Sequence, residues 1–112
     1  MSDGTAMSVR LDLNNPVFQR ALFKLPKNDQ RNILNTLRKI ADMTWDQVYT
    51  DRGLRWEIIL SRKGPSGSRL YSFRIGKGFR AIGYREQSWL RILSLHPDHS
   101  AINDSGKSLI VW

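Results

Sequence analysis

The hydrophobic pattern of this chain changes its period close to the turn-forming residues Asp51-Arg52-Gly53. Over most of the stretch before that point, apolar residues recur every three or four positions, as they do along the buried side of a helix. Beyond it, apolar and polar residues alternate, as they do in strands that bury one face. Helices followed by consecutive strands within 112 residues predict a single α+β domain that spans residues 1–112.

The first half predicts one strand and two helices. Apolar and polar residues alternate over Ser8–Leu13, which indicates a strand. Asn14-Asn15-Pro16 then predicts a helix start, because asparagine can cap the first amides and proline fits the first helical position. This helix ends at Pro26, which can open a second one. The apolar stripe of the second helix consists of Ile33, Leu34, Leu37, Ile40 and Ala41. A further short turn of helix over residues 43–48 is compatible with the sequence, which does not decide it.

The second half predicts an antiparallel meander. An extended segment over 56–61 and a loop at 63–68 precede three strands that follow each other through short turns. The three strands are Leu70–Ile75, Phe79–Tyr84 and Trp89–Leu95. A sheet this small must bury one face, and the two helices supply the cover. If the apolar side of the first of these strands meets the helices, Arg74 lies on the open face.

The two ends of the chain are expected to differ from its middle. Residues 1–7 and 103–108 are predicted to be flexible, and the apolar segment Leu109–Trp112 can add an edge strand. The first residues are small and polar, so no secretory leader is expected. The sequence contains no run of about 20 apolar residues, which is the length that predicts a transmembrane helix. We therefore expect a cytoplasmic protein without a membrane partner.

The charge balance favours a polyanionic partner. Lysine and arginine number 18 against 10 aspartates and glutamates, which gives a net charge of +8. Most of the excess lies between Arg62 and Arg91, where Glu86 is the only acidic residue. This makes nucleic acid the leading partner hypothesis, ahead of an acidic membrane or protein. A solvated basic face is the alternative.

Metal and nucleotide motifs are missing from the sequence. There is no cysteine, which excludes disulfides and cysteine-based zinc sites. His96 and His99 stand three residues apart beside Asp98, but no further histidine completes a metal site. Gly106-Lys107-Ser108 lacks the leading glycine and the following helix of a phosphate loop. We expect neither a metal ion nor another cofactor.

The polar residues of the second half fit metal-free RNA cleavage. In that reaction a base takes the proton of the 2′-hydroxyl, an acid protonates the departing 5′-oxygen, and cations stabilise the charged phosphate. Arg74 and Arg80 flank one turn, where two guanidiniums can grip one phosphate. Glu57 is either the base or the partner of a neighbouring arginine. His96 and His99 are candidate acids, and a solvated loop histidine is the alternative for His99.

Four segments carry a resemblance to a known family: Arg55-Trp56-Glu57, Leu70–Ile75, Phe79–Ile82 and Leu93–His99. Together with the strand and two helices before them, they resemble the RelE/ParE superfamily of toxins from type II toxin–antitoxin systems, over about residues 9–102. The resemblance implies a RelE-like, microbial-ribonuclease-type fold, with an N-terminal strand and a two-helix hairpin packed on a small antiparallel sheet. RelE-like members cleave mRNA in the ribosomal A site without a metal ion, and an antitoxin neutralises each of them.

The resemblance also implies roles for individual residues. Arg80 matches the family's catalytic arginine, which stabilises the transition-state phosphate, and Arg74 matches a basic strand position. Glu57 falls where some members place a glutamate base, and His96 and His99 fall in a segment that supplies an acid or a phosphate contact. Further RNA or phosphate contacts are expected from Arg55, Arg62, Lys63, Arg69, Lys77 and Arg91.

Two positions depart from the family pattern. Ile102 stands near the place where many members carry a tyrosine, and Ser72 stands where some carry a lysine. The sequence therefore predicts a metal-independent endoribonuclease toxin with no cofactor, whose partners are a cognate antitoxin, mRNA and the ribosome. The alternatives are a ParE-like inhibitor of DNA gyrase without nuclease activity and a catalytically inactive antitoxin-binding module.

Overall fold

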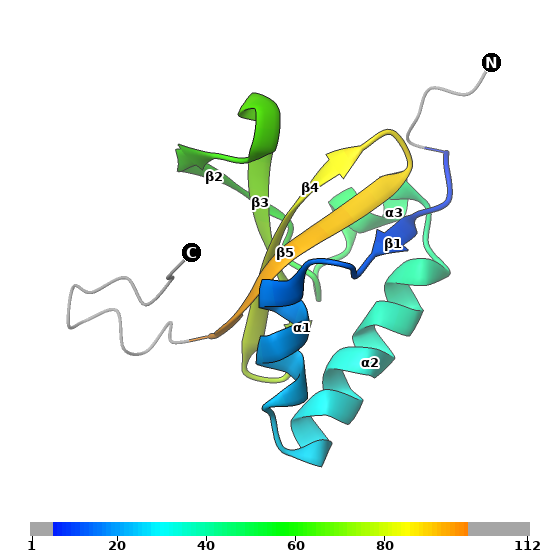
Figure 1. Ribbon diagram of the computed structural model, residues 1–112. Helices are drawn as coiled ribbons and strands as arrows, with labels where there is room; N and C mark the ends of the chain where they lie inside the picture. Colours follow the sequence, from blue (N-terminus) through cyan, green and yellow to red (C-terminus); the bar gives the residue numbers. More distant parts are fainter. Residues whose placement is uncertain (1–5, 99–112) are drawn as a thin grey trace.

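The computed structural model describes residues 6–98, which form an α+β domain, as predicted (Figure 1). In chain order the elements are β1 (Arg10–Asp12), α1 (Pro16–Phe23), α2 (Lys27–Ala41), α3 (Trp45–Thr50), β2 (Glu57–Lys63), a 3₁₀ turn (Pro65–Gly67), β3 (Arg69–Gly76), β4 (Phe79–Glu86) and β5 (Trp89–Pro97). Most of the predicted flexible segment 1–7, all of 103–108 and the predicted edge strand Leu109–Trp112 lie outside the described residues.

The sheet combines the predicted antiparallel meander with one parallel strand. Its order is β1-β5-β4-β3-β2, and the pairs β2–β3, β3–β4 and β4–β5 are antiparallel. β1 pairs in parallel with β5, from Arg10 opposite Trp89 to Asp12 opposite Arg91. Parallel neighbours need a long connection, and the elements from α1 to β4 provide it. The local sequence pattern of β1 carries no information about this direction.

α1 and α2 begin where the sequence predicts. The side chain of Asn15 accepts a hydrogen bond from the Val17 amide at 2.8 Å, and Pro16 is the first helical residue. The buried residues of α2 are Ile33, Leu37 and Ile40. Leu34 and Ala41, which also belong to the predicted stripe, are exposed. The helical period turns Leu34 about 90° and Ala41 about 70° away from the centre of the buried face.

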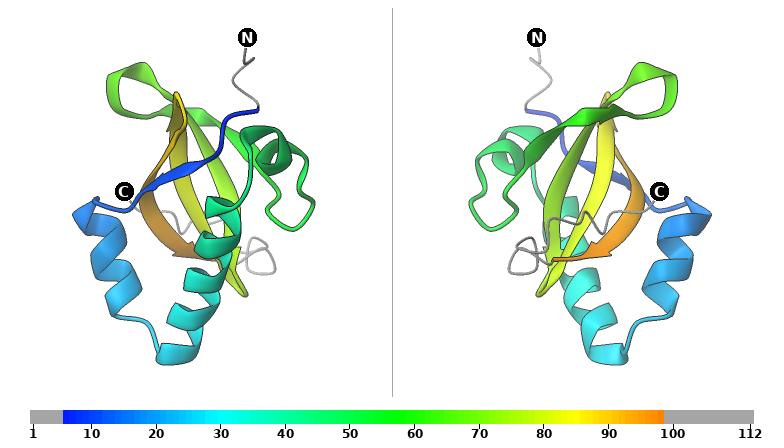
Figure 2. Two further views of the ribbon diagram at one scale, coloured as in Figure 1. Left: turned by 90° about the vertical axis from the view of Figure 1, so that its right-hand side faces the viewer. Right: turned by 90° about the vertical axis from the view of Figure 1, so that its left-hand side faces the viewer.

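The two helices cover one face of the sheet, and the core lies between them and the strands (Figures 1 and 2). One buried cluster joins α1, α2 and the sheet. It includes Phe18, Leu22, Ile33, Leu37, Ile40, Phe73, Ile75, Leu90 and Ile92. The other face of β3, β4 and β5 is therefore turned away from α1 and α2, as predicted for Arg74.

A third helix, α3, overlaps the stretch 43–48, where the sequence did not decide whether a short helical turn forms. It begins with a capping box, in which the Thr44 hydroxyl accepts from the Gln47 amide and the Gln47 side chain accepts from the Thr44 amide. Trp45 is fully buried, and its indole N–H donates to the carbonyl oxygen of Ser88 at 3.0 Å. These contacts fix α3 on the turn between β4 and β5.

A β-bulge between β4 and β5 decides which side chains of β5 face the core. The adjacent residues Ile82 and Gly83 pair with Ser94 and Ile92, so β5 has one extra residue at this point. Even-numbered residues of β5 point into the core before the bulge, whereas Leu95 does so after it. The bulge thereby turns Ser94 and His96 to the face of the sheet that lies away from α1 and α2.

Candidate active site

Two neighbouring rows of side chains cross the face of the sheet that is turned away from α1 and α2, here called the open face. Residues directly opposite each other in antiparallel strands point to the same side, so the strand pairing defines each row. The first row, here called the cationic row, consists of Arg74, Arg80 and His96. The second, here called the serine row, consists of Glu57, Ser72, Ile82 and Ser94. The two rows thus bring together four of the five predicted catalytic residues. The fifth, His99, lies outside the described residues.

Arg80 is the residue on which the two rows converge. Its Nη2 atom lies 2.9 Å from Oγ of Ser72, 3.1 Å from Oε1 of Glu57 and 2.9 Å from the carbonyl oxygen of Arg55. Its side chain is only 16% exposed. Burial lowers the pKa of Arg80, and the carboxylates of Glu57 and Asp98 oppose this effect. The guanidinium stays charged at neutral pH because its pKa starts far above 7.

The remaining donors of Arg80 determine what the site can bind. A guanidinium has five N–H donors, and all the hydrogen bonds that Arg80 makes to described residues come from Nη2. Its Nε–H and Nη1–H groups are therefore not used by the described part of the chain. Both forks of a guanidinium that can bind two oxygens of one phosphate include Nη2, because Nε–H and Nη1–H point to different sides of the group. Nε–H and Nη1–H can therefore each donate a single hydrogen bond to an anion while Nη2 keeps its contacts to Ser72 and Glu57.

The loop before β2 presents a backbone oxygen to Arg80. Leu54 is buried, its amide donates to the Asp51 side chain at 2.9 Å, and its carbonyl oxygen accepts from the Arg74 amide. Arg55 follows with a φ of 50°, in the left-handed region that costs a non-glycine residue about 1 kcal/mol or more. Its carbonyl oxygen is the one that accepts from Arg80. The strained residue is thus part of the support of the candidate site.

Glu57 forms ion pairs with two arginines. Its Oε1 lies 3.1 Å from Arg80 Nη2, and its Oε2 lies 3.8 Å from Arg55 Nη2. Its side chain remains more than half exposed. The sequence left two readings of Glu57 open, a base or an arginine partner. In this structure Glu57 pairs with both arginines, and its role as a base stays a prediction.

Arg74 lies beside an acidic residue to which the sequence assigns no role. Its Nη2 is 3.8 Å from Oδ2 of Asp98, and the Asp98 amide donates to the carbonyl oxygen of Gly78 at 2.7 Å. The turn between β3 and β4 thereby holds Asp98 next to the cationic row. Asp98 therefore places a negative charge beside the guanidinium of Arg74.

His96 is enclosed at the β5 end of the cationic row. It is 7% exposed, and its Nε2 is hydrogen-bonded to Oγ of Ser94 at 2.8 Å. Ser94 is 2% exposed. Burial lowers the pKa of His96 below its ordinary value of 6.5. The imidazole is therefore mainly neutral at pH 7, and it must gain a proton before it can act as an acid.

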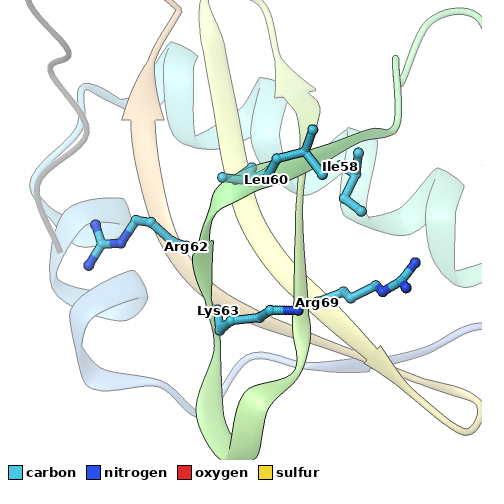
Figure 3. A pocket seen from close by; sticks show the side chains of 6 residues that line it. Ile58, Leu60, Arg62, Lys63 and Arg69 are labelled. Atoms are coloured by element: carbon cyan, nitrogen blue, oxygen red, sulfur yellow. The ribbon is translucent and has the colours of Figure 1, made fainter.

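The predicted RNA contacts are distributed over three places. Arg55 lies at the site, and Lys77 occupies the turn next to Gly78, which accepts from Asp98. Arg62, Lys63 and Arg69 line a hollow at the far end of the β2–β3 hairpin (Figure 3). Arg91 lies about 16 Å along β5 from His96. It forms ion pairs with Asp12 at 2.7 Å and with Glu86 at 2.6 Å.

Sequence reasoning gave no site role to Ser72 and Ser94. Ser72 precedes Arg74 by two residues on one strand, a spacing that places both on the same face. That spacing was a usable signal. Ser94 offered no such signal, because simple alternation along β5 assigns it to the core side with Ile92. Only the bulge places Ser94 and His96 on the open face.

Residues 6–98 contain neither a metal-binding cluster nor a membrane-spanning helix. Over that range, no group of three or more histidine, cysteine, aspartate or glutamate side chains is arranged to hold a metal ion. No helix in the same part of the chain has the length and apolar character needed to cross a membrane.

The fold resembles that of a solved toxin–antitoxin complex. No protein-family model matches the chain, and the comparison with curated proteins gave no match. Among solved structures, it is similar to a chain in the crystal structure of the archaeal RelE–RelB complex from Pyrococcus horikoshii OT3. The two chains share 23% sequence identity with a TM-score of 0.54, over 85% of this chain and 98% of the other. This protein therefore has the RelE-like fold that the sequence predicts.

Proposed function

We propose that this protein is the toxin of a toxin–antitoxin pair and that it inhibits translation by cleaving mRNA without a metal ion. The observation that carries the proposal is the position of Arg80. Its Nη2 is held by Ser72, Glu57 and the Arg55 carbonyl, and its other N–H groups are not used by described residues. A charged, oriented and largely enclosed guanidinium on the face of the sheet that is turned away from α1 and α2 is suited to stabilising extra charge on a phosphate.

The proposed reaction is attack of the RNA 2′-oxygen on the adjacent phosphorus. The P–O bond to the 5′-oxygen of the next nucleotide breaks, which leaves a 2′,3′-cyclic phosphate and a 5′-hydroxyl. Glu57 takes the proton of the 2′-hydroxyl, and an acid returns one to the departing 5′-oxygen. Arg80 and Arg74 bind the non-bridging oxygens, on which negative charge increases in the transition state.

His96 is our choice for the acid among the described residues, and His99 is the second candidate. A neutral imidazole has to be protonated first, since burial lowers the pKa of His96. Its neighbour in the cationic row is Arg80, so a phosphate bound there brings negative charge close to the ring. A nearby negative charge raises the pKa of an imidazole. Substrate binding thus favours the protonated form that the reaction needs.

The proposed setting is the ribosomal A site in the cytoplasm. The net charge of +8 favours binding to an RNA-rich surface, because each phosphate contact releases counterions. The proposed second partner is a cognate antitoxin, which the same charge predicts to be acidic where it binds. The solved neighbour comes from a RelE–RelB complex, which supports the antitoxin partner.

The decisive experiment maps mRNA ends by primer extension after brief expression of the protein. We expect new ends within translated codons, growth arrest, and loss of both in Arg80→Ala. The matched control is Arg38→Ala, which removes an exposed arginine of α2 far from the open face. Equal cleavage by Arg80→Ala, or no cleavage by the parent chain, contradicts the nuclease. Growth arrest with DNA-damage signalling and inhibited gyrase assigns the chain to the ParE-like alternative instead.

A further inference from the structure

Ser94 and His96 form an enclosed hydrogen-bonded pair on β5. Oγ of Ser94 lies 2.8 Å from Nε2 of His96, and the two residues are 2% and 7% exposed. They are two residues apart after the bulge, so both lie on the open face of the sheet. The hydrogen bond holds the imidazole ring in one orientation, because turning the ring would separate two polar atoms that are enclosed together.

A serine is costly at this position unless its hydroxyl is used. The residue opposite Ser94 on β4 is Ile82, which is 1% exposed, so the hydroxyl stands next to a buried aliphatic side chain. Removing a hydroxyl from water costs free energy that a hydrogen bond has to offset. The hydrogen bond that Ser94 Oγ makes goes to His96. Bonding to the imidazole is therefore what offsets the cost of enclosing this hydroxyl.

A hydroxyl is suited to both charge states of the ring. It can donate one hydrogen bond and accept others, and a protonated imidazole donates from both of its nitrogens. Ser94 Oγ can therefore accept from Nε2–H when the ring is charged. It can also accept when the ring is neutral and carries its proton on Nε2. In neither state does the ring have to turn, so the pair can persist while His96 gains and loses a proton.

We propose that Ser94 is a positioning residue for His96: its hydroxyl accepts from Nε2–H, so that Nδ1 is the atom that delivers the proton to the departing 5′-oxygen. Ser94 itself is too enclosed to contact the substrate. In the transfer the Nδ1–H bond breaks and an O–H bond to the 5′-oxygen forms. The ring becomes the neutral Nε2–H tautomer and keeps its bond to Ser94. The orientation of the ring stands by itself, whereas the use of its proton rests on the proposed function.

Among the described residues, three charged side chains act on this ring from the open face, while α1 packs against the other face of β5. Arg80 pairs with His96 across the strands, and Arg74 is next in the cationic row. Both arginines oppose protonation of the ring, and Asp98, which lies beside Arg74, favours it. The bond to Ser94 also favours the protonated ring, since a hydrogen bond from a charged donor is about twice as strong as a neutral one.

The first test is an NMR titration of the imidazole nitrogens in the purified chain. His99→Gln leaves one histidine in the sequence and so assigns the signals of His96. When the ring is neutral, we expect the chemical shifts of the Nε2–H tautomer. Ser94→Ala should lower the midpoint of the His96 titration by about 0.5–1 pH unit, because the charged ring loses its acceptor. An Nδ1–H tautomer in the parent chain, or an unchanged midpoint in Ser94→Ala, refutes the positioning role.

The second test measures the rate of mRNA cleavage on programmed ribosomes as a function of pH. An acid works only while it is protonated, so Ser94→Ala should move the alkaline limb of the pH–rate profile to lower pH by the same amount. At neutral pH the rate should then fall about three- to tenfold. The matched control is Ser88→Ala, which truncates a serine of the β4–β5 turn that is 9% exposed and should leave the profile unchanged.

Different results contradict the two levels of the proposal. No cleavage by the parent chain, with the expected tautomer and titration shift, refutes the proposed function and leaves Ser94 as the partner that orients the ring. Cleavage with the same pH profile in Ser94→Ala refutes the role of the pair in the reaction. A rate loss that is equal at every pH refutes it as well, because such a loss is structural. If Ser94→Ala does not fold, Ser94→Cys replaces it in both measurements, since a thiol is only a weak acceptor.

Discussion

Oγ of Ser72 lies 2.9 Å from Nη2 of Arg80, so a residue of β3 holds the guanidinium of a residue near the start of β4. The two residues are diagonal neighbours, because Arg80 pairs with Arg74 and Ser72 pairs with Ile82. This contact joins the cationic row to the serine row. It restricts the orientation of the Arg80 guanidinium, whose remaining N–H groups are proposed to bind the phosphate together with Arg74.

Ser72→Ala is expected to slow cleavage without unfolding the protein. Loss of one hydrogen bond worth about 1 kcal/mol lets the Arg80 guanidinium move, which should lower the cleavage rate about fivefold. The measurement is the rate of appearance of cut mRNA after induction. Ser61→Ala, which removes an exposed hydroxyl of β2, serves as the control and should cleave like the parent. Equal rates in both variants would show that Ser72 does not position Arg80.

His96 is expected to make stability depend on pH. Its folded pKa lies below its ordinary value of 6.5 because the ring is buried, so the unfolded chain binds more protons in this range. The free energy of unfolding should therefore rise as the pH increases from the folded pKa of His96 to about 6.5. Urea titrations at several pH values measure it. His96→Gln should lose this part of the pH dependence, and an unchanged slope would contradict the prediction.

Arg91 and Asp12 are expected to act as a pair that holds β1 on β5. Their atoms Nη1 and Oδ2 are 2.7 Å apart, in the register where the two residues are partners. Asp12→Asn and Arg91→Ala should each lower the free energy of unfolding, and the double variant should lose less than the sum of the two single losses. Urea titration of all four proteins completes this cycle. Additive losses would mean that the pair is not coupled.

The same pair predicts an acid effect. The amide of Asn14 and the Arg91 side chain hold the pKa of Asp12 below its usual value of 3.8. A carboxylate with a lowered folded pKa stabilises the protein above its unfolded pKa and loses this contribution as the pH falls through the folded one. The stability difference between the parent and Asp12→Asn should therefore be largest near neutrality and shrink below about pH 4.

Gly83→Ala is expected to disturb the bulge. A Cβ atom at this position would lie 2.5 Å from the backbone oxygen of Arg91, which cannot move without displacing β5. We expect a loss of about 1–3 kcal/mol of stability, the range found for overpacked sites. The control is Gly67→Ser, because a Cβ at Gly67 meets no atom within 4 Å, although its φ of 77° adds some strain. A Gly83→Ala variant as stable as the parent would contradict this role of the bulge.

Much of the architecture could be predicted because its signals are local. The Asn15 cap, the proline starts of α1 and α2, and the alternation in β3 and β4 all depend on residues close in sequence. The open-face position of Arg74 followed from that alternation. The roles of Glu57, His96 and Arg80 in cleavage are still proposals, since neither the fold nor its solved neighbour tests them.

The remaining features depend on contacts between distant segments. The parallel direction of β1, the bulge opposite Gly83 and the contact from Ser72 to Arg80 exist only when strands pair. Alternation along β5 would place Ser94 and His96 on the core side with Ile92, but one extra residue in the strand turns them to the opposite side of the sheet. Local periodicity therefore set the kind and order of the elements. Strand pairing set which side chains meet, because register is a property of two strands and not of one.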